Sequence, residues 1–425
     1  MRCPKTALII AVAVSAALAA GGCRPHTPEE PAAAGQRRRL LLTVLAGQST
    51  SDPGIEEMIG EVVSRELPEV DLYWDRMDWG EQFNAQMKYR FAAGEIPDIM
   101  IGKAQDVSVY APTGNLAPFS EELTSFITAD ALPAVTRGGQ VYGIPYNAFY
   151  QGVLYNQDIF EEHHLHVPET RGDLEELVDV LTNLGITPFA AHFEENWYTA
   201  NIFMQFAINN VLGREPGWSD RFRNGEVSFA NSPEIRDGLL SIRYVLDHSW
   251  PDAFSVNQID GDARFAAGEA AMYLSGSWSL QQIAYSNPGI RLGIFPYPNP
   301  GGDASLIREL NLTFMKSAVT SHPDGVDRVL KVVLADRDLA YRIFEYTKTT
   351  SLLRHIEPEQ PLPINTDVEG FAGRGMVVDA ELGNSQLIWS FQEDFAEQVL
   401  RWLRGASDLE TVLEYADRNS QLSAP

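Results

Sequence analysis

Cysteine is almost absent from this chain of 425 residues, which contains only Cys3 and Cys23. If the N-terminal segment is removed as a signal, Cys23 alone remains, so the mature protein would have no internal disulfide. Long hydrophobic runs are also missing, because no stretch after the first 22 residues has 18 consecutive apolar side chains. The sequence therefore predicts no transmembrane helix beyond that segment.

Basic residues are scarce as well. The chain has 32 lysines and arginines against 58 aspartates and glutamates, for a formal net charge of −26. Phosphate binding needs clustered basic side chains, so this balance argues against nucleic acid and anionic lipid surfaces as partners. A phosphate loop, a dinucleotide-binding glycine pattern and a nucleophile elbow are all missing, and no cofactor is predicted.

Two enzyme-like signals are weak. Residues 161–166 read Glu-Glu-His-His-Leu-His, but no second ligand cluster at a recognisable spacing accompanies them, so no metal site is predicted. A glycoside hydrolase needs two facing carboxylates, and among 58 acidic residues the sequence selects no pair. A secreted carbohydrate-active enzyme remains an alternative that the sequence leaves open.

The N-terminus has the composition of an export signal. A short basic start precedes an apolar segment at residues 7–18 and small residues at 19–22, so residues 1–22 are predicted to be a signal peptide. Residues 23–36 are rich in proline, alanine and glutamate and read as a tether. Small residues directly before Cys23 resemble a bacterial lipoprotein box, although Ala20 stands where leucine is usual. This resemblance implies a lipoprotein anchored to the membrane through acylated Cys23, at the cell surface or in the periplasm.

The globular part begins with alternating strands and helices. Strand patterns at residues 40–45, 70–74 and 98–101 alternate with helical patterns at 55–66 and 80–93. This order predicts right-handed crossovers and a parallel sheet, hence an α/β fold. Residues 47–52 and 102–108 are expected to be loops at the carboxyl ends of the first and third strands. An extended segment at 141–156 is expected to cross between two lobes.

One run concentrates several signals. In residues 264–278, Arg-Phe-Ala-Ala-Gly-Glu-Ala-Ala-Met-Tyr-Leu-Ser-Gly-Ser-Trp, a helix is expected to end at Gly268 and a buried parallel strand to cover 270–274. A sharp turn at Gly276 would then present Trp278 beyond the carboxyl end of the strand, where open α/β sheets bind ligands. The alternative is that Trp278 only fills a core.

Several stretches resemble a known family in the family's order: "GEIPDIM", "YGIPYNAFYQGVLYNQDIF", "ENWYT", "FAAGEAAMYLSGSW" and "LNLTFMKSAV". They are similar to extracellular solute-binding proteins of ABC transporters, in the branch that binds sugars, over about residues 38–416. Arg171 departs from the family, which commonly has tryptophan there. The resemblance implies a two-lobed periplasmic-binding-protein-like fold of type II, with two or three crossover segments. Lobe one would take residues 37–144 and about 310–341, and lobe two would take 145–309 and about 342–425.

The function implied by the resemblance is capture, without catalysis. A sugar or oligosaccharide would bind in the cleft between the lobes, hinge closure would enclose it, and the monomeric protein would deliver it to ABC transporter permease subunits. A binding protein for a non-sugar ligand is the other alternative.

The resemblance also implies site residues. Aromatic planes suit the apolar faces of a sugar ring, and amide or carboxylate groups suit its hydroxyls. Trp278 and Trp197 would stack on the sugar, and a third aromatic would be Trp389, with Phe391 as its alternative. Trp197 and Trp389 could equally be core residues, Asp106 could be a solvated loop residue, and Tyr146 and Asn147 could only shape the hinge. The remaining predicted contacts are Gln48, Ser49, Gln105, Asp106, Tyr146, Asn147 and Tyr150.

Overall fold

A sheet of eleven strands runs through the computed structural model of this protein. The structure describes residues 39–47, 53–77, 81–215, 217–356, 362–381, 384, 387 and 389–420. Along its main path the strand order is β2-β1-β3-β11-β7-β9-β8. By their contacts, the residues from Arg39 onward form one compact unit. No helix in these ranges is both long enough and apolar enough to cross a membrane.

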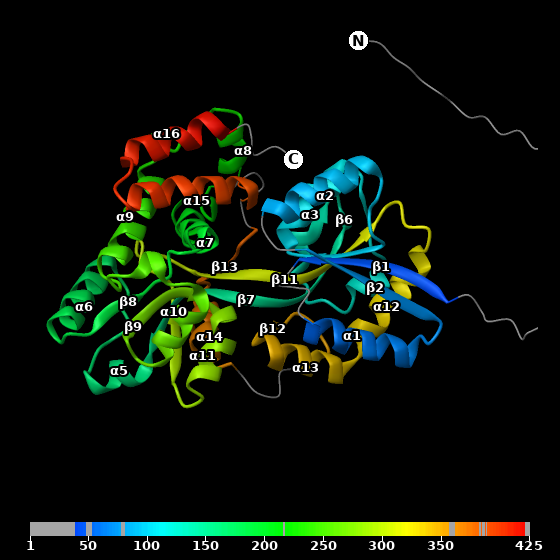
Figure 1. Cartoon of the computed structure of the whole chain (residues 1–425), viewed down its shortest axis with the longest axis horizontal. Coiled ribbons are helices and arrows are strands. Elements are labelled where there is room, and N and C mark those ends of the chain that lie inside the picture. The colour runs from blue at the N-terminus through cyan, green and yellow to red at the C-terminus, as the bar shows by residue number, and fades with distance from the viewer. Residues whose placement is uncertain are drawn as a thin grey trace, which may run out of the picture. The chain divides into compact units, whose positions relative to one another are not determined.

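The first three strands are parallel, as the strand and helix order predicts. Strand β1 (Leu40–Gly47) pairs in parallel with β2 (Val70–Met77) on one side and with β3 (Ile99–Gly102) on the other. Helices α1 (Pro53–Glu66) and α2 (Glu81–Ala93) make the connections. Figure 1 shows α2 and α3 on one side of these strands and α1 on the other.

Two long strands connect the two halves of the sheet. β7 (Gly143–Asn156) and β11 (Leu306–Ser317) pair antiparallel from Met315 opposite Gly143 to Ile307 opposite Gln151. The extended segment predicted at residues 141–156 is thus confirmed as one strand. Figure 1 shows both strands passing between the two groups of helices.

The apolar side chains form two separate clusters, which we call the first core and the second core. The first core is built by β1–β3, the N-terminal parts of β7, the C-terminal part of β11 and their helices. Its other elements are α3 (Ala104–Tyr110), η1 (Ala111–Thr113), β4 (Leu116–Ala117), α4 (Glu121–Thr124), η2 (Leu132–Val135), β6 (Gln140–Val141), α12 (Pro323–Ala335) and α13 (Arg337–Thr347). The short strands β5 (Thr136–Arg137) and β12 (Thr350–Ser351) lie beside these elements in the chain and add no apolar side chain to the core.

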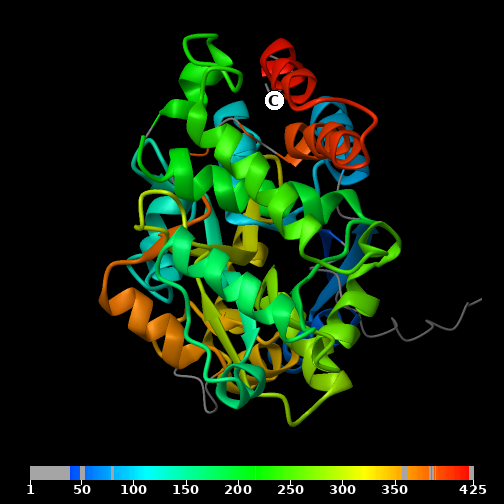
Figure 2. The ribbon, with the colours of Figure 1, turned by 90° about the vertical axis from the view of Figure 1, so that its left-hand side faces the viewer.

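The second core contains most of the remaining elements and the other halves of β7 and β11. Figure 2 views the molecule from this side. The elements are α5 (Gln157–Glu162), α6 (Arg171–Asn183), β8 (Thr187–Ala190), α7 (Asn196–Ala207), η3 (Ile208–Leu212), α8 (Trp218–Arg223), α9 (Pro233–Asp247), η4 (Ala253–Ser255), α10 (Gln258–Ala266), β9 (Ala270–Gly276), η5 (Ser277–Ser279), α11 (Leu280–Ser286), β10 (Leu292–Phe295), α14 (Asn365–Gly373), β13 (Val377–Asp379), α15 (Trp389–Leu403) and α16 (Leu409–Asn419).

Three local expectations need correction. Residues 102–108, expected to be a loop, contain α3, because the Asp106 carboxylate turns back to accept the Lys103 backbone N–H at 2.9 Å and so caps a helix. Strand β9 is parallel to β8 but antiparallel to β7, so its surroundings are mixed. Gly276 is extended and makes no sharp turn. Gly268, by contrast, is left-handed as predicted, with φ of 79°.

Candidate functional site

Two tryptophans lie together at one end of the second core, and we call them the tryptophan pair. Trp197 is in the first turn of α7, shortly after β8, and Trp278 is in η5, directly after β9. Their ring centroids are 6.4 Å apart at an interplanar angle of 71°. Both side chains are half-buried. Because β8 and β9 are parallel, their carboxyl ends meet at one edge of the sheet, which explains why these two rings meet.

The ring of Trp278 is held from two sides. Phe149 on β7 packs edge-on against it, with centroids 5.9 Å apart and an interplanar angle of 86°. A side chain at Gly276 would overlap the six-membered part of the indole. The backbone at Gly276 is extended, a conformation that any residue can adopt, so backbone conformation does not explain the glycine. Glycine is needed at this position because a side chain would collide with the Trp278 ring.

A continuous line of polar side chains, which we call the polar chain, crosses between the two cores. It starts at Lys103, which precedes α3 and forms an ion pair with Glu309 on β11. Gln151 on β7 donates its amide to the other oxygen of Glu309. Asn201 Nδ2 on α7 then donates to Gln151 Oε1 at 3.4 Å. Glu309 and Gln151 are both buried, so each side chain satisfies a neighbour that water cannot reach.

The polar chain ends beneath the tryptophan pair. Gln205 Nε2 donates to Asn201 Oδ1 at 3.0 Å and to the backbone oxygen of Ser275 at 3.3 Å. The Ser275 hydroxyl in turn lies 3.0 Å from the Ser279 hydroxyl. Ser279 is the residue after Trp278, so hydrogen bonds connect the start of α3 with the segment that carries the tryptophan.

Gln105 and Asp106 lie in the first turn of α3, next to Lys103, where the polar chain starts. Gln105 Nε2 donates to the Leu387 backbone oxygen at 3.4 Å, and Leu387 belongs to the second core. The Asp106 carboxyl is engaged as the cap of its own helix. Burial raises the pKa of Asp106 to about 6, while the Lys103 backbone N–H and charge oppose the shift and the charge of Glu309 adds to it.

The three predicted residues on β7 have different surroundings. Tyr146 is completely buried in the first core, between the rings of Phe314 and Phe344. Asn147 is also fully buried and donates to the Thr349 hydroxyl at 2.8 Å. Tyr150 is half-buried against the second core, and its backbone N–H donates to the Ser277 hydroxyl at 3.1 Å. Of the three, Tyr150 is the one that forms a hydrogen bond with η5, the segment that carries Trp278.

The other predicted residues can be located only in part. Gln48, Ser49 and the lipidation candidate Cys23 lie outside the described residues. Trp389 is the first residue of α15. Its alternative, Phe391, is 5% exposed and stacks on Phe395 inside the second core.

Sequence reasoning missed the polar chain, including Lys103, Gln151, Asn201, Gln205 and Glu309. A signal for two of them was present, because Trp197, Asn201 and Gln205 are spaced by four residues and share one face of α7. Amide side chains four and eight residues after the candidate stacking Trp197 indicate that this face of the helix is polar and turned toward the site. Glu309 had no such local signal, since its partners are distant in sequence.

A second connection between the strands lies beside the polar chain. Arg308 on β11 pairs with Asp379 of β13, with Nε 2.6 Å from Oδ1, and also with Asp130 of the loop after α4. The two carboxylates raise the pKa of Arg308 above its ordinary value, although its burial opposes this. The guanidinium is therefore charged and holds the crossing strand from both sides.

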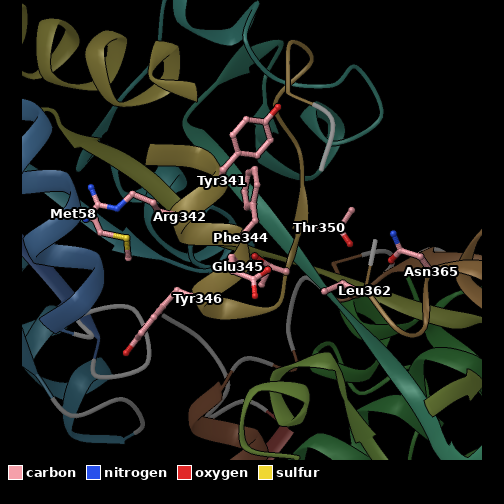
Figure 3. Close-up of a pocket in the computed structure, with 10 residues that line it drawn as sticks. Met58, Tyr341, Arg342, Phe344, Glu345, Tyr346, Thr350, Leu362 and Asn365 are labelled. Carbon is pink, nitrogen blue, oxygen red and sulfur yellow. The ribbon is translucent and has the colours of Figure 1, made fainter. Parts of the chain in front are cut away.

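A separate pocket of about 590 Å³ is lined by α13 together with Met58 of α1 and residues near the start of α14 (Figure 3). Tyr341, Phe344 and Tyr346 form its aromatic side. Neither member of the tryptophan pair and no residue of the polar chain lines it. Among the described residues, no group of three or more histidine, cysteine, aspartate and glutamate side chains is placed to hold a metal ion.

Comparison with protein families gives one match over most of the chain. Residues 47–338 match the family described as bacterial extracellular solute-binding protein. A relative named multiple sugar-binding protein, from Streptococcus mutans, is 27% identical over 206 residues, which are 47% of this chain and 48% of the relative. An uncharacterized ABC transporter extracellular-binding protein of Pyrococcus horikoshii is 23% identical over 65% of this chain and 64% of its own length. The chain thus matches about half to two thirds of these relatives' lengths.

Solved structures share the fold over nearly the whole chain. The one named "SBP RafE in complex with raffinose" has a TM-score of 0.74 and 19% identity, and covers 91% of this chain and 100% of its own. A chitin oligosaccharide binding protein has a TM-score of 0.76 and 17% identity, with 91% and 99% covered. A sugar transporter structure from Bacillus licheniformis, in complex with stachyose, has a TM-score of 0.75 and 14% identity, with 90% and 100% covered. At these identities the likeness establishes the fold, which agrees with the predicted two-lobed α/β class.

Proposed function

The chain belongs to the bacterial extracellular solute-binding protein family, and on that premise we propose that it is the sugar-binding component of an ABC importer. The observation that carries the proposal is the tryptophan pair, placed at the end of the polar chain that crosses between the two cores. The name of the Streptococcus mutans relative and the ligands of two structural neighbours, raffinose and stachyose, support a sugar as the ligand class.

In this proposal the two cores are the centres of two lobes that close on the ligand. Lobe one takes residues 37–144 and about 310–341, and lobe two takes 145–309 and about 342–425. The first core also contains Phe344, Leu352, Leu353 and Ile356, which supports moving this boundary from about 341 to near 356, so that residues 342–356 would belong to lobe one. β7 and β11 would bend while the ligand, by contacting both lobes, shifts the population toward the closed form.

The proposed contacts divide by chemistry. Trp197 and Trp278 would cover the apolar faces of sugar rings, and Tyr150 would border them. Amide and carboxyl groups would hydrogen-bond the hydroxyls, with Asn201 and Gln105 as the half-buried members of that set. Asp106 would supply a charge-assisted acceptor. Gln48, Ser49 and Trp389 complete the proposed set by family resemblance, and Tyr146 and Asn147 would act by fixing the crossing strand.

Placement outside the cell membrane is part of the same proposal. Cys23 would carry the lipid anchor after removal of residues 1–22, and the closed monomer would present both lobes to the permease. The ligand is released unchanged in this scheme, so no catalytic group is assigned.

A thermal-shift screen of the purified chain over mono- and oligosaccharides tests the ligand class. A ligand at 100 times its dissociation constant stabilises the folded protein by about 2.7 kcal/mol, which raises the melting temperature measurably. Small-angle scattering of the chain with the best sugar should then show compaction. If no sugar in the panel shifts the melting temperature or compacts the chain, the proposed ligand class is wrong. Turnover of an oligosaccharide by the same sample would instead favour an enzyme.

A further inference from the structure

Two neighbouring residues of the crossing strand β11 carry opposite charges and lie on opposite faces of the sheet. Arg308 is in register with Tyr150 of β7 and with Asp379 of β13, and Glu309 is in register with Phe149 of β7. Successive side chains of a strand point to opposite faces, whereas residues in register on neighbouring strands share a face. Arg308, Tyr150 and Asp379 therefore lie on one face, which we call the arginine face, and Glu309 and Phe149 lie on the other.

The face of Glu309 is also the face of the tryptophan pair, and we call it the tryptophan face. Phe149 packs edge-on against Trp278, with ring centroids 5.9 Å apart. On the same face, Gln151 of β7 donates its amide to Glu309 and accepts a hydrogen bond from Asn201 of α7. Helix α15 packs on α7 and also contacts α2, which belongs to the first core. The distance between α2 and α15 therefore reports how closely the two cores approach each other on the tryptophan face.

Each face has one ion pair that connects the crossing strand with the first core. On the tryptophan face, Glu309 pairs with Lys103, the residue directly before α3. On the arginine face, Arg308 pairs with Asp130, which lies between α4 and η2. The same guanidinium is held from β13, which packs against the second core, because Arg308 Nε lies 2.6 Å from Asp379 Oδ1 and Nη2 lies 3.1 Å from Oδ2.

Bending of the crossing strands out of the plane of the sheet affects the two ion pairs in opposite ways. A motion that brings the cores together on the tryptophan face moves Lys103 toward Glu309 and moves Asp130 away from Arg308. The reverse motion does the opposite. Separating the charges of a partly buried ion pair leaves them poorly solvated, so each pair favours the arrangement that keeps its partners together. The two pairs therefore act against each other.

We propose that Arg308 and Glu309 are positioning residues that set the angle between the two lobes through these opposed ion pairs. The pair of Lys103 and Glu309 favours closure over the tryptophan face, and the pair of Asp130 and Arg308 favours the open arrangement. The proposal rests on the proposed function only for its effect on sugar affinity, which follows because both lobes contact the ligand in the closed arrangement.

Pulsed electron spin resonance of the full chain measures the lobe angle without any ligand. Because Cys3 and Cys23 are the only cysteines, replacing both by serine leaves a chain in which new cysteines can be labelled selectively. Gln86→Cys on α2 and Glu397→Cys on α15 place spin labels at two exposed positions, one on each side of the contact between these helices.

Two matched variants in the labelled chain test the opposition directly. Glu309→Gln should lengthen the mean distance between the labels, whereas Asp130→Asn should shorten it. Each variant removes one negative charge, so a general effect of net charge would move the distance in the same direction in both. Any result other than shifts of opposite sign in the expected directions, including an unmoved distance in either variant, overturns the proposal.

A second variant and a control complete this experiment. Lys103→Gln removes the other partner of Glu309 and should also lengthen the distance, which keeps the test decisive if Glu309→Gln does not fold. Glu122→Gln breaks an exposed ion pair with Lys331 between two helices of the first core and should leave the distance unchanged. A distance that stays constant or shortens in Lys103→Gln contradicts the proposal, as does a shift in Glu122→Gln as large as that in Asp130→Asn.

Sugar affinity, measured by titration calorimetry, provides a separate test. Glu309→Gln should raise the dissociation constant by about threefold or more, and Asp130→Asn should lower it by a similar factor, because apparent affinity follows the population of the binding-competent arrangement. Unchanged constants, or changes in the same direction, would overturn the link between the ion pairs and binding. Failure of every sugar to bind the wild-type chain would overturn the proposed function, and the ligand-free distances would still decide whether the ion pairs set the lobe angle.

Discussion

The two cores bring different chemistry to the candidate site. The first core contributes Lys103 and Gln105 from the start of α3, which reach across by an ion pair and a hydrogen bond of 3.4 Å. The second core contributes two aromatic rings, and Phe149 packs against that of Trp278 where the lack of a side chain at Gly276 leaves room for it. The aromatic side is therefore organised before a ligand arrives, while the polar side depends on how the cores approach each other. This difference predicts that changes in the second core alter affinity and that changes in the first core alter closure.

The largest effect is expected from removing the aromatic side. Trp278→Ala should weaken sugar binding by about 30-fold or more, because a buried aromatic anchor commonly contributes at least 2 kcal/mol to binding. The ligand-dependent thermal shift should vanish, and the unliganded melting temperature should change little because the ring is half-buried. If the unliganded protein unfolds instead, Trp278 serves the core and the comparison between the two sides fails.

A companion variant tests whether binding depends on the position of the Trp278 ring, while the ring itself is kept. Gly276→Ala places a Cβ against the Trp278 indole and must displace it. Affinity should fall by about tenfold with all side chains of the site still present, as measured by titration calorimetry. Gly60→Ala in α1 serves as the control, because a Cβ there meets no atom within 4 Å. Gly405→Ala would be a poor control, because the positive φ at that position makes any side chain strained.

The burial of Asp262, which is 1% exposed, should also be visible in stability. Because the pKa of Asp262 is raised from 3.8 to about 7, the folded protein keeps a proton that the unfolded chain has lost between these values. Its contribution to stability is complete below about pH 4 and is lost as the pH rises through 7, at about 1.4 kcal/mol per pH unit. Asp262→Asn removes this loss.

The measurement is urea unfolding of both proteins at pH 5 and pH 7. The free energy of unfolding of Asp262→Asn, relative to wild type, should rise by about 2 kcal/mol over this interval. Asp260→Asn, an exposed change on the same helix, should show no such change. Parallel curves for wild type and Asp262→Asn would show that Asp262 is ionised at both pH values.

A smaller effect is expected in the polar chain. Glu309→Gln leaves the amide contact with Gln151 but removes the charge opposite Lys103, so unfolding free energy should fall by about 2 kcal/mol. The exposed pair of Lys331 and Glu122 provides the control, since Glu122→Gln should change stability by less than about 0.5 kcal/mol. Equal effects of the two changes would contradict the structural importance of the polar chain.

The smallest effect concerns a single contact that Gln105 makes with the second core. Gln105→Ala removes one hydrogen bond to Leu387 O, and that oxygen remains satisfied by Gln392 Nε2 at 2.6 Å. Stability should therefore fall by only about 0.5–1 kcal/mol. Scattering should show a more open unliganded chain if this contact favours closure. An unchanged scattering profile would place the control of closure elsewhere, for example at Arg308.

Much of the local structure could be predicted from sequence because its causes are local. The Thr170 and Asp173 side chains form a capping box at the start of α6, and Ser232 accepts the Ile235 N–H at the start of α9 with Pro233 in its first turn. Apolar periodicity gave β1–β3 and their helices to within a few residues. The error at residues 102–108 arose because the Asp106 carboxyl caps a short helix, which periodicity over seven residues does not reveal.

The candidate site was predictable only where its residues follow strand ends. Trp197 and Trp278 were expected near a ligand, and parallel pairing of β8 with β9 brings them together. Whether these residues contact a sugar stays a prediction, as do the contacts of Gln105, Asp106 and Tyr150. Tyr146 shows that a place on the crossing strand does not by itself identify a ligand contact. Neighbouring residues of β7 face different elements, and the Tyr146 ring lies inside the first core.

By itself, the sequence determined the order of strands and helices, their caps and the family to which the chain belongs, since these depend on neighbouring residues. Only the tertiary structure decided which polar groups meet. Gln151 and Glu309 are 158 positions apart, and their contact exists because β7 and β11 pair antiparallel in one register. Asp262 was unremarked in the sequence for the same reason, because the burial that raises its pKa is a property of packing.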